Sequence, residues 1–457
     1  AEAASEAPAH LVLERALRCL PGRRLVAEGK VAGETVLVKC FLGPRSRSLL
    51  WREVRGLRAL QAAGLPAVGE RIAYHMPKGG VLVTDWLAAA QPLDLGRPDE
   101  QVKAVELLAD LHRSGLSHAD PHPANFLLPA GALQPFPIDA GAIQRRGCWS
   151  RGGRHRSEWR ELARLIVQCP MDALLGENDR WSESAEIEGR LVAAYQRRRG
   201  DASPAPSASD WQALLYDARR TRVRRYLRKT LRSTSEFEQR DQPDARVYVL
   251  RAALTPALEA VIADPAAAMA GGESLKAGRS ATVVRPSSAA GWVIKRYNRP
   301  GLLQSWRRRL APRARAAWRN GHHLALLGIP TARPLALIEP SAKKTEATPY
   351  LVLEDHGDGL IDRHARTVGV SERLANQVGR LLLGLRRADI AHRDTKASNL
   401  LVTQQEQVVL IDLDGLRHRP GGDRRDALRF LANWTRPGDA DSLARFTAAL
   451  RRRGLVT

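Results

Sequence analysis

Two short segments, HRDTKASNLLV (residues 392–402) and VVLIDLDG (residues 408–415), decide the fold of this chain. In the first segment, Asp394 and Asn399 are five positions apart. In the second, Asp412 follows the apolar run VVLI and lies 18 residues beyond Asp394. A short apolar run that ends at an acidic residue is typical of a buried strand that leads into a site. The pattern therefore predicts a loop and a strand end that bring two carboxylates and one amide together.

An earlier part of the chain repeats this pattern. HADPHPANFLL (residues 118–128) is followed by PIDAG (residues 137–141), so Asp120 and Asn125 are again five positions apart. Asp139 lies 19 residues beyond Asp120, almost the same separation as in the later copy. Such self-similarity in one order indicates a repeated structural unit.

Lysines at the ends of short apolar runs complete the repeat. Gly22 precedes Lys39 by 17 positions, and Gly278 precedes Lys295 by the same 17. Each half then has a Gly-apolar-Pro turn and an apolar strand that ends in an acidic residue. For either lysine alone, a strand-end side chain that extends its ammonium into water is the simpler explanation. The shared order of all these landmarks instead predicts a tandem duplication.

The residue types at these positions suit the transfer of a phosphoryl group from ATP. This chemistry needs a cation on the non-transferred phosphates, oxygen ligands for Mg²⁺ and a base that positions the acceptor hydroxyl. The pattern H-x-D-x-x-x-x-N, with a later Asp after a strand, is the corresponding signature of kinase folds. The predicted roles are nucleotide binding for Lys39, Lys295, Gly22 and Gly278, base for Asp120 and Asp394, and Mg²⁺ binding for Asn125, Asp139, Asn399 and Asp412.

Histidines in the two loops allow a second interpretation. His118, His122 and Asp120 are of the residue types that bind zinc, but no fourth ligand or cysteine is spaced for such a site. We therefore expect His118 and His392 to have structural roles within their loops.

The order of these motifs resembles that of the lipopolysaccharide core heptose kinase and InaA-like group of bacterial kinase-fold proteins. The resemblance rests on the strand lysine, GIPTARPLAL (residues 328–337), LVLED (residues 351–355) and the two segments quoted first. It covers roughly residues 270–430 well and residues 15–165 more loosely. It implies an ATP- and Mg²⁺-dependent kinase that acts on a heptose hydroxyl of the inner core, at the cytoplasmic face of the inner membrane. The stretch HADPHPANF is also similar to the D-x-H-x-x-N loops of other atypical kinases.

The two halves depart from the usual kinase pattern in different places. Glu53, fourteen residues after Lys39, is the predicted helix carboxylate that holds this lysine, but the aligned position in the second half is Ala317. Conversely, Lys396 lies two residues after the second predicted base, at a phosphate-stabilising position, where the first half has His122. Neither half has a full G-x-G-x-x-G loop or an A-P-E element. We favour the first unit as the more complete catalyst because of Glu53, with a scaffold that contains a pseudokinase unit as the alternative.

Composition narrows the class of protein further. The 457 residues are enough for two or three domains, and 44% hydrophobic residues are typical of a globular protein. Four cysteines without metal spacing, no signal-peptide pattern and no apolar run of membrane-span length predict a cytoplasmic protein with reduced thiols. A formal net charge of +23 attracts polyanions, which include nucleotide phosphates, anionic lipids, phosphorylated glycans and nucleic acids.

Two basic segments are candidate landing sites for such anions. Residues 219–232 form a nearly all-basic helical stretch after Trp211. Residues 305–319 place arginines beside Trp306 and Trp318. A solvated basic helix face is the alternative, but guanidinium groups match phosphate, so we expect binding of the lipopolysaccharide core, a similar anionic glycan or the anionic membrane surface. Nucleic-acid binding is disfavoured because no nucleic-acid-binding motif accompanies the charge.

The expected architecture is α+β, with two tandem bilobal kinase-like domains over residues 1–240 and 241–457. Each domain should have a small antiparallel sheet with one helix, followed by a mainly helical lobe that is short in the second domain. The Pro/Ser-rich stretch 201–210 is predicted to be a loop. The expected activity is phosphotransfer to a sugar hydroxyl of lipopolysaccharide, with a kinase for proteins or small alcohols as the alternative.

Overall fold

The computed structural model describes residues 10–145, 151–171, 181–200, 204–287, 291–298, 313–341, 348–357, 359–419, 421–423 and 425–457. The chain divides into two compact units, one made of residues 1–169 and 188–219 and the other of residues 170–187 and 220–457. Both units combine helices with antiparallel sheets, which confirms the predicted α+β class. The predicted boundary between residues 240 and 241 lies inside strand β11 (Phe237–Asp241) of the second unit. Within the described residues, no helix combines the length and the apolar character needed to cross a membrane.

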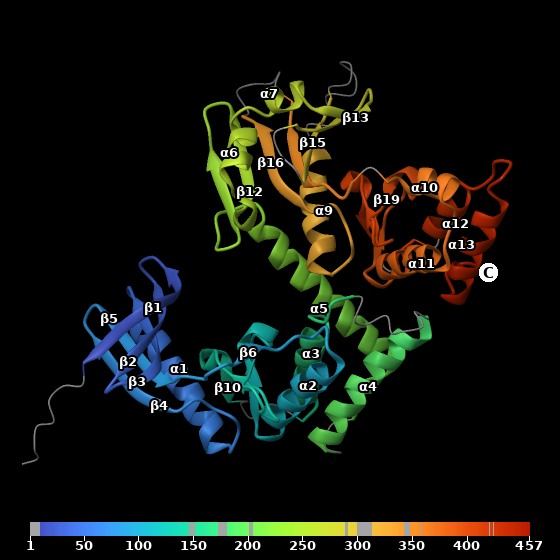
Figure 1. Ribbon diagram of the computed structural model, residues 1–457. Coiled ribbons are helices and arrows are strands. Elements are labelled where there is room, and N and C mark those ends of the chain that lie inside the picture. Colours follow the sequence, from blue (N-terminus) through green and yellow to red (C-terminus); the bar gives the residue numbers. More distant parts are fainter. Residues whose placement is uncertain are drawn as a thin grey trace, which may run out of the picture. The chain divides into compact units, whose positions relative to one another are not determined.

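The first unit begins with a five-stranded antiparallel sheet. Its strand order is β1 (Leu11–Leu20), β2 (Arg24–Val31), β3 (Glu34–Leu42), β5 (Gly79–Asp85) and β4 (Glu70–Met76) (Figure 1). Helix α1 (Ser46–Ala62) covers one face, because Leu50, Val54 and Leu57 recur at helical spacing and pack with Phe41 of the sheet. Since strand side chains alternate between faces, Lys39 lies on the same face as Phe41 and points toward α1.

The rest of the first unit is mainly helical and carries the short strands of the predicted loop. Its elements are β6 (Gln91–Pro92), α2 (Pro98–Arg113), β7 (Leu116–His118), η1 (Pro123–Asn125), β8 (Phe126–Leu128), β9 (Phe136–Pro137), η2 (Ala140–Ala142), β10 (Ile143–Arg145), α3 (Arg151–Ile166), α4 (Trp181–Arg199) and the start of α5 (Ala208–Lys229). Trp159 of α3 packs against Tyr195 of α4 and Trp211 of α5, with ring centroids 5.2 Å and 6.0 Å away. These contacts join the three helices. The predicted loop at 201–210 is shorter than expected, because α5 already begins at Ala208.

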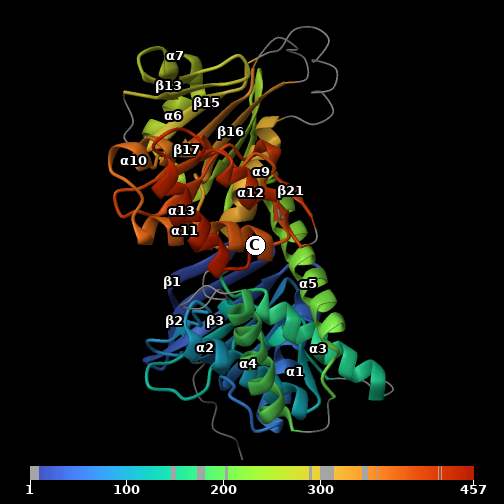
Figure 2. The same cartoon turned by 90° about the vertical axis from the view of Figure 1, so that its right-hand side faces the viewer.

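The second unit is built on a seven-stranded antiparallel sheet. Its strand order is β11 (Phe237–Asp241), β12 (Ala245–Leu250), β16 (Pro334–Pro340), β17 (Tyr350–Glu354), β15 (Trp292–Arg296), β14 (Thr282–Arg285) and β13 (Glu273–Ala277). Strands β13 to β17 follow the strand order of the first unit, and the β11–β12 hairpin extends the sheet beyond β16. Helix α9 (Arg313–Leu326) packs Ala314, Ala317 and Trp318 into the core of this sheet (Figures 1 and 2). Helices α6 (Pro256–Ala263) and α7 (Pro265–Ala270) add Leu258 and Met269 to the same core.

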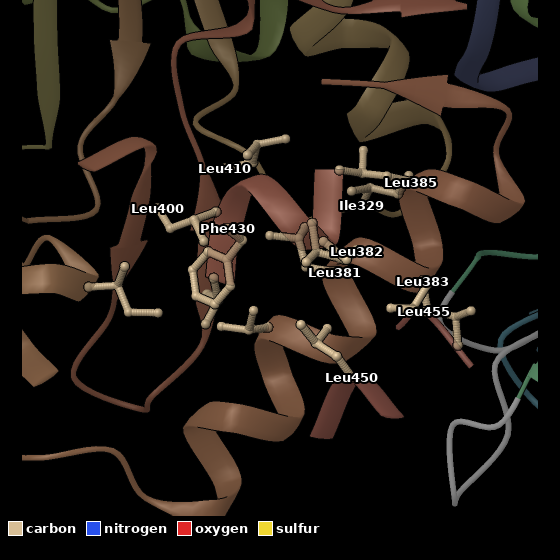
Figure 3. Close-up of a cluster of buried hydrophobic side chains, with 14 of the residues drawn as sticks. Ile329, Leu381, Leu382, Leu383, Leu385, Leu400, Leu410, Phe430, Leu450 and Leu455 are labelled. Atoms are coloured by element: carbon tan, nitrogen blue, oxygen red, sulfur yellow. The ribbon is translucent and has the colours of Figure 1, made fainter. Parts of the chain in front are cut away.

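A helical lobe with two small strand pairs completes the second unit. Its elements are α10 (Ile361–Thr367), α11 (Glu372–Arg387), β18 (Ile390–Ala391), η5 (Ala397–Asn399), β19 (Leu400–Val402), β20 (Val408–Leu410), η6 (Leu413–Gly415), β21 (Arg417–His418), α12 (Arg425–Leu431) and α13 (Ala440–Arg452). The Ser371 hydroxyl caps α11 by accepting a hydrogen bond from the Leu374 N–H at 2.9 Å. The apolar face of α11 contributes Leu381 and Leu385 to a core that also contains Phe430 of α12 (Figure 3). This core supports the loop that follows β18.

Equivalent elements follow one another in the two units. Strands β3 and β15 carry the two predicted nucleotide lysines, and helices α1 and α9 come next in the chain. Strand β7 pairs with β10 as β18 pairs with β21, and the turns η1 and η5 end at the two predicted asparagines. The landmarks of the sequence repeat therefore occupy matching elements.

Candidate functional site

In the first unit, Lys39 and Glu53 form a buried ion pair. The Lys39 ammonium lies 3.0 Å from Glu53 Oε2 and donates a second hydrogen bond to the Ile138 carbonyl at 2.9 Å. The other oxygen of Glu53 accepts a hydrogen bond from Arg24 at 2.8 Å. Only 9% and 4% of the Lys39 and Glu53 side chains are exposed, so water and salt screen this pair little. The structure thus brings together two residues that the sequence paired, and it adds Arg24 as a second cation.

The loop after β7 places Asp120 and Asn125 beside the strand end that carries Asp139. Asp120 is exposed, whereas Asn125 and Asp139 are half-buried. The side-chain amide of Asn125 donates to the Asp120 carbonyl at 3.0 Å, and the Asn125 carbonyl accepts from the Ile138 N–H at 3.0 Å. Since Ile138 directly precedes Asp139, this second bond makes the two acids and the amide neighbours. Gly22 forms the β1–β2 turn with a φ of +68°, which glycine adopts without strain.

In the second unit, Lys295 pairs with Asp412 instead of a helix carboxylate. The Lys295 ammonium lies 2.7 Å from Asp412 Oδ1, and the aligned helix position is the buried Ala317. Burial alone would raise the pKa of Asp412, but the charge and the hydrogen bond of Lys295 outweigh burial and lower it. Burial also disfavours the charged form of Lys295, yet Tyr297 and the carboxylates of Asp412 and Asp414 raise its pKa. Both groups are therefore charged at neutral pH.

The second loop repeats the hydrogen bonds of the first. The Asn399 side-chain amide donates to the Asp394 carbonyl at 2.8 Å, and the Asn399 carbonyl accepts from the Ile411 N–H at 3.0 Å. The Lys396 ammonium lies 2.9 Å from Asp394 Oδ1, and both side chains are exposed. The predicted base therefore has a cation beside it that the first loop lacks.

Gly278 belongs to a turn that a neighbouring strand holds in place. Its N–H donates to the Ala281 carbonyl at 3.0 Å, and its carbonyl accepts from the Asn298 side-chain amide at 2.7 Å. The same amide lies 2.9 Å from the Thr282 hydroxyl, and the Asn298 N–H donates to the Ser280 carbonyl at 3.1 Å. The turn between β13 and β14 thus has a side-chain clamp in place of a glycine-rich sequence.

Two buried carboxylates that sequence reasoning missed hold the loops. Glu161 of α3 accepts a hydrogen bond from the His118 N–H. Asp426 of α12 accepts hydrogen bonds from the N–H groups of His392 at 2.7 Å and Arg393 at 3.0 Å. These acids lie 43 and 34 residues beyond the histidines that they bind, so no residue within the loops predicts the contacts. The sequence feature that could have indicated these two contacts is an acidic residue within the apolar face of each helix.

The loop histidines are neutral at physiological pH. Burial lowers the pKa of His118 to about 4, and its ring packs on Phe126 with centroids 5.2 Å apart. Burial also lowers the pKa of His392, although the charge of Asp426 opposes this shift. Both rings are buried, which agrees with packing roles.

The oxygen donors of each site suit Mg²⁺ bound together with a nucleotide. Mg²⁺ in such sites takes one or two protein carboxylates, phosphate oxygens and several waters. Lys295 holds Asp412 ionised, and Asn399 lies beside Asp412. In the first unit, Asn125 likewise lies beside Asp139. Within the described ranges, no group of three or more His, Cys, Asp and Glu side chains is placed to share a metal ion. The carboxylate and amide oxygens of each site suit a metal ion that also binds phosphate oxygens.

Two tryptophans near the predicted basic landing sites, Trp318 and Trp211, are core residues. Trp318 is fully buried, and its indole donates to the Thr230 carbonyl at 3.1 Å. Trp211 is buried against Trp159. Neither ring is accessible to a ligand. The helical period accounts for the burial of Trp318, because this residue shares the sheet-facing side of α9 with Ala314.

Several basic residues of α5 are exposed in the second unit. The exposed basic residues are Arg220, Arg224, Arg225, Arg228 and Lys229, and none has an ion pair within the described part of the chain. Steps of four place the first, second and fourth of these on one side of the helix. Arg222 instead donates to the Leu326 carbonyl at 3.3 Å. Residues 305–312 of the other basic segment, which include Trp306, and residues 201–203 of the predicted loop lie outside the described residues.

Comparison with known proteins shows what this chain is similar to. Residues 278–436 match the family model "Lipopolysaccharide kinase (Kdo/WaaP) family". Similar solved structures include WaaP in complex with acyl carrier protein, at 21% identity over 47% of this chain and 90% of that chain, with a TM-score of 0.30. Another is the kinase PK-1 of Cydia pomonella granulovirus, at 16% identity over 30% of this chain and 55% of that chain, with a TM-score of 0.25. No curated protein sequence matches the chain.

The family match confirms the resemblance and the expected enzyme class. The matched stretch contains Lys295, the loop with Asp394 and Asn399, and Asp412. Residues 278–436 match the lipopolysaccharide kinase (Kdo/WaaP) family, and the protein is an ATP-dependent phosphotransferase with an alcohol group as acceptor.

Proposed function

We propose that this protein uses ATP and Mg²⁺ to transfer the γ-phosphoryl group to a heptose hydroxyl of the lipopolysaccharide inner core. The observation that carries the proposal is the grouping of Lys295 with Asp412, and of Asp394 with Asn399, inside the stretch that matches the lipopolysaccharide kinase family. A cation, two acids and an amide are the groups that phosphoryl transfer requires.

We propose a role for each residue of the C-terminal site that agrees with its position. The exposed Asp394 would accept the proton of the attacking hydroxyl, and Lys396 would stabilise the transferred group from 2.9 Å away. Lys295 would neutralise the non-transferred phosphates. Asn399 and Asp412 would hold Mg²⁺, which when bound offsets charge on the β- and γ-phosphates. The acceptor oxygen bonds to the γ-phosphorus as the bond to the β-phosphate oxygen breaks, and ADP leaves.

We extend the proposal to the first unit, as the other half of a tandem duplication with its boundary near residue 240. Its loop has the same hydrogen bonds as the second loop, and its Lys39–Glu53 pair favours it as an active site. His122 stands in place of the second-loop lysine, and its ring accepts a hydrogen bond from the Ala124 N–H at 3.2 Å. This difference supports the alternative that one unit is a pseudokinase in a scaffold.

The exposed arginines of α5 support an anionic acceptor. Guanidinium groups bind phosphate through two parallel hydrogen bonds, and Arg224, Arg225 and Arg228 are exposed on one helix. The anionic surface of the inner membrane would attract the same side chains and keep a cytoplasmic enzyme near its substrate. A kinase for proteins or small soluble alcohols remains the second candidate.

Labelled ATP and the full chain test the proposal. Label should appear in lipopolysaccharide or its core oligosaccharide, at a rate that falls as added salt screens exposed charges. Asp394→Ala and Asp120→Ala should each lower turnover of their own unit by about 10²–10⁴-fold, while calorimetry still detects ATP binding. Asp441→Ala, an exposed acid of α13, is the control. Efficient labelling of generic proteins, with lipopolysaccharide ignored at low salt, would refute the acceptor, and full activity of the double Asp variant would refute both bases.

A further inference from the structure

Helix α9 is held against the C-terminal site by contacts that differ from those of α1. The Arg313 guanidinium, in the first turn of α9, forms an ion pair with the Asp414 carboxylate. The Asn320 side-chain amide donates to the Leu413 carbonyl at 2.7 Å. The Asp414 side chain is 10% exposed and that of Arg313 is 30% exposed. Two side chains of α9 thus bind the two residues that directly follow Asp412.

The Arg313–Asp414 pair is linked to the Lys295–Asp412 pair through one aromatic ring. The Arg313 guanidinium lies 5.7 Å from the centroid of the Tyr297 ring, and the Lys295 ammonium lies 5.0 Å from the same centroid. Tyr297 is 5% exposed. Because both cations are attracted to the same ring, the position of that ring affects both of them. A shift of Arg313 would therefore disturb the surroundings of Lys295 as well.

The first unit has the opposite arrangement of charges. Its helix supplies the carboxylate, Glu53, and Gly141 occupies the position that corresponds to Asp414. A Cβ atom on Gly141 would lie 3.4 Å from Glu53 Cγ, so the helix carboxylate packs over a residue that has no side chain. In the second unit the carboxylate is that of Asp414 and the cation is Arg313 of the helix. Asp414 belongs to residues 412–415, which start at the predicted metal ligand Asp412 and are called the metal segment below. Besides its predicted metal aspartate, each unit therefore has one further carboxylate at this junction. It comes from the helix in the first unit (Glu53) and from the metal segment in the second (Asp414).

We propose that Arg313 and Asp414 are positioning residues of the C-terminal site, where their ion pair replaces the pairing of a helix carboxylate with the strand lysine. The inference rests on the proposed phosphotransfer function of this site. Asp412 has a φ of +60°, a backbone conformation that needs support from its surroundings. Fixing Asp414 two residues later keeps Asp412 aimed at Lys295. With Asp412 in this position, Lys295 has a carboxylate partner although α9 supplies none.

Steady-state kinetics in the Asp120→Ala background tests this assignment, because turnover then reports the C-terminal site. Arg313→Ala and Asp414→Asn should each lower kcat by about 10–100-fold with a smaller change in the KM for ATP. Arg313→Lys should retain more activity than Arg313→Ala. The charge-swapped double variant, Arg313→Asp with Asp414→Arg, should recover part of the loss, which a purely structural role does not predict.

Arg315→Ala is the matched control. Arg315 lies on the same helix and forms an ion pair with Glu339 of β16, away from the metal segment. It should leave kcat within about twofold of the parent, because packing of the helix alone does not position reacting groups. Equal kcat in Arg313→Ala, Asp414→Asn and the parent would overturn the inference. Failure of the proposed function is distinguishable, because Asp394→Ala would then retain full turnover in the same assay.

Discussion

Replacing Glu53 by alanine should destabilise α1 far more than the loss of an exposed ion pair does. In the native protein, Glu53 binds both Lys39 and Arg24, and its side chain is 4% exposed. The substitution leaves the Lys39 ammonium buried, with the Ile138 carbonyl as its described partner. Removing one partner of a buried pair costs about 3–5 kcal/mol, because the other charge stays buried. We expect about 3 kcal/mol, the lower end, because Arg24 is 25% exposed and can regain water.

Native-state hydrogen exchange of the full chain, measured by mass spectrometry on α1 peptides, checks this value. A loss of about 3 kcal/mol corresponds to roughly 100-fold faster exchange. The control is Glu70→Ala, which breaks a pair with Arg58 of α1 whose side chain is 62% exposed and should cost at most about 1 kcal/mol. Glu53→Gln, which keeps an acceptor oxygen, should fall between the two. Equal acceleration in Glu53→Ala and Glu70→Ala would show that burial does not decide the energy of this pair.

Two further predictions concern packing and pH. Gly56→Ala should lower the melting temperature of the first unit, at a cost of about 1–3 kcal/mol, because the new Cβ would lie 1.8 Å from the Ala140 carbonyl oxygen. Gly189→Ala, on an exposed face of α4 with nothing within 4 Å, should instead stabilise by up to about 1 kcal/mol, and equal shifts would contradict the packing argument. The unfolding free energy should fall as the pH drops from 6.5 to about 4, since unfolded His118 binds a proton in this window and the folded ring does not. The loss from this group should reach about 3 kcal/mol. His118→Gln should reduce the change of unfolding free energy with pH, whereas His10→Gln, at an exposed position, should not. An unchanged pH dependence in His118→Gln would show that other groups cause it.

Contacts between neighbouring elements were predictable from sequence spacing. Lys39 closes a strand and Glu53 lies in the helix that follows, so a kinase-like order of elements brings them together at 3.0 Å. The loop bonds of Asn125 and Asn399 are equally local, because each joins residues five positions apart. In these places, secondary structure and chain connectivity leave little freedom for other arrangements.

Contacts that depend on tertiary docking were not predictable in the same way. Arg313 and Asp414 are 101 positions apart, and which turn of α9 meets the metal segment depends on how the helix packs on the sheet. The sequence showed that the helix acid is missing, but not that Asp412 itself binds Lys295. The same reason applies to Asp426, which reaches its loop from a later helix. The burial of Trp318, in contrast, follows from local spacing, because the helical period places it with the core residues Ala314 and Ala317 of α9.

The turn clamped by Asn298 has a consequence for the thermodynamics of nucleotide binding. A glycine-rich loop is flexible when free, so the free energy of ligand binding must offset the entropic cost of ordering the loop. Here two hydrogen bonds of the Asn298 side chain and one from its backbone order the turn before any nucleotide arrives. Preorganisation reduces the entropic cost of association, but a clamped turn cannot fold down as a lid over the phosphates. With less closure available, we expect the C-terminal site to stay open on the side of the β13–β14 turn, which would suit the proposed glycan acceptor.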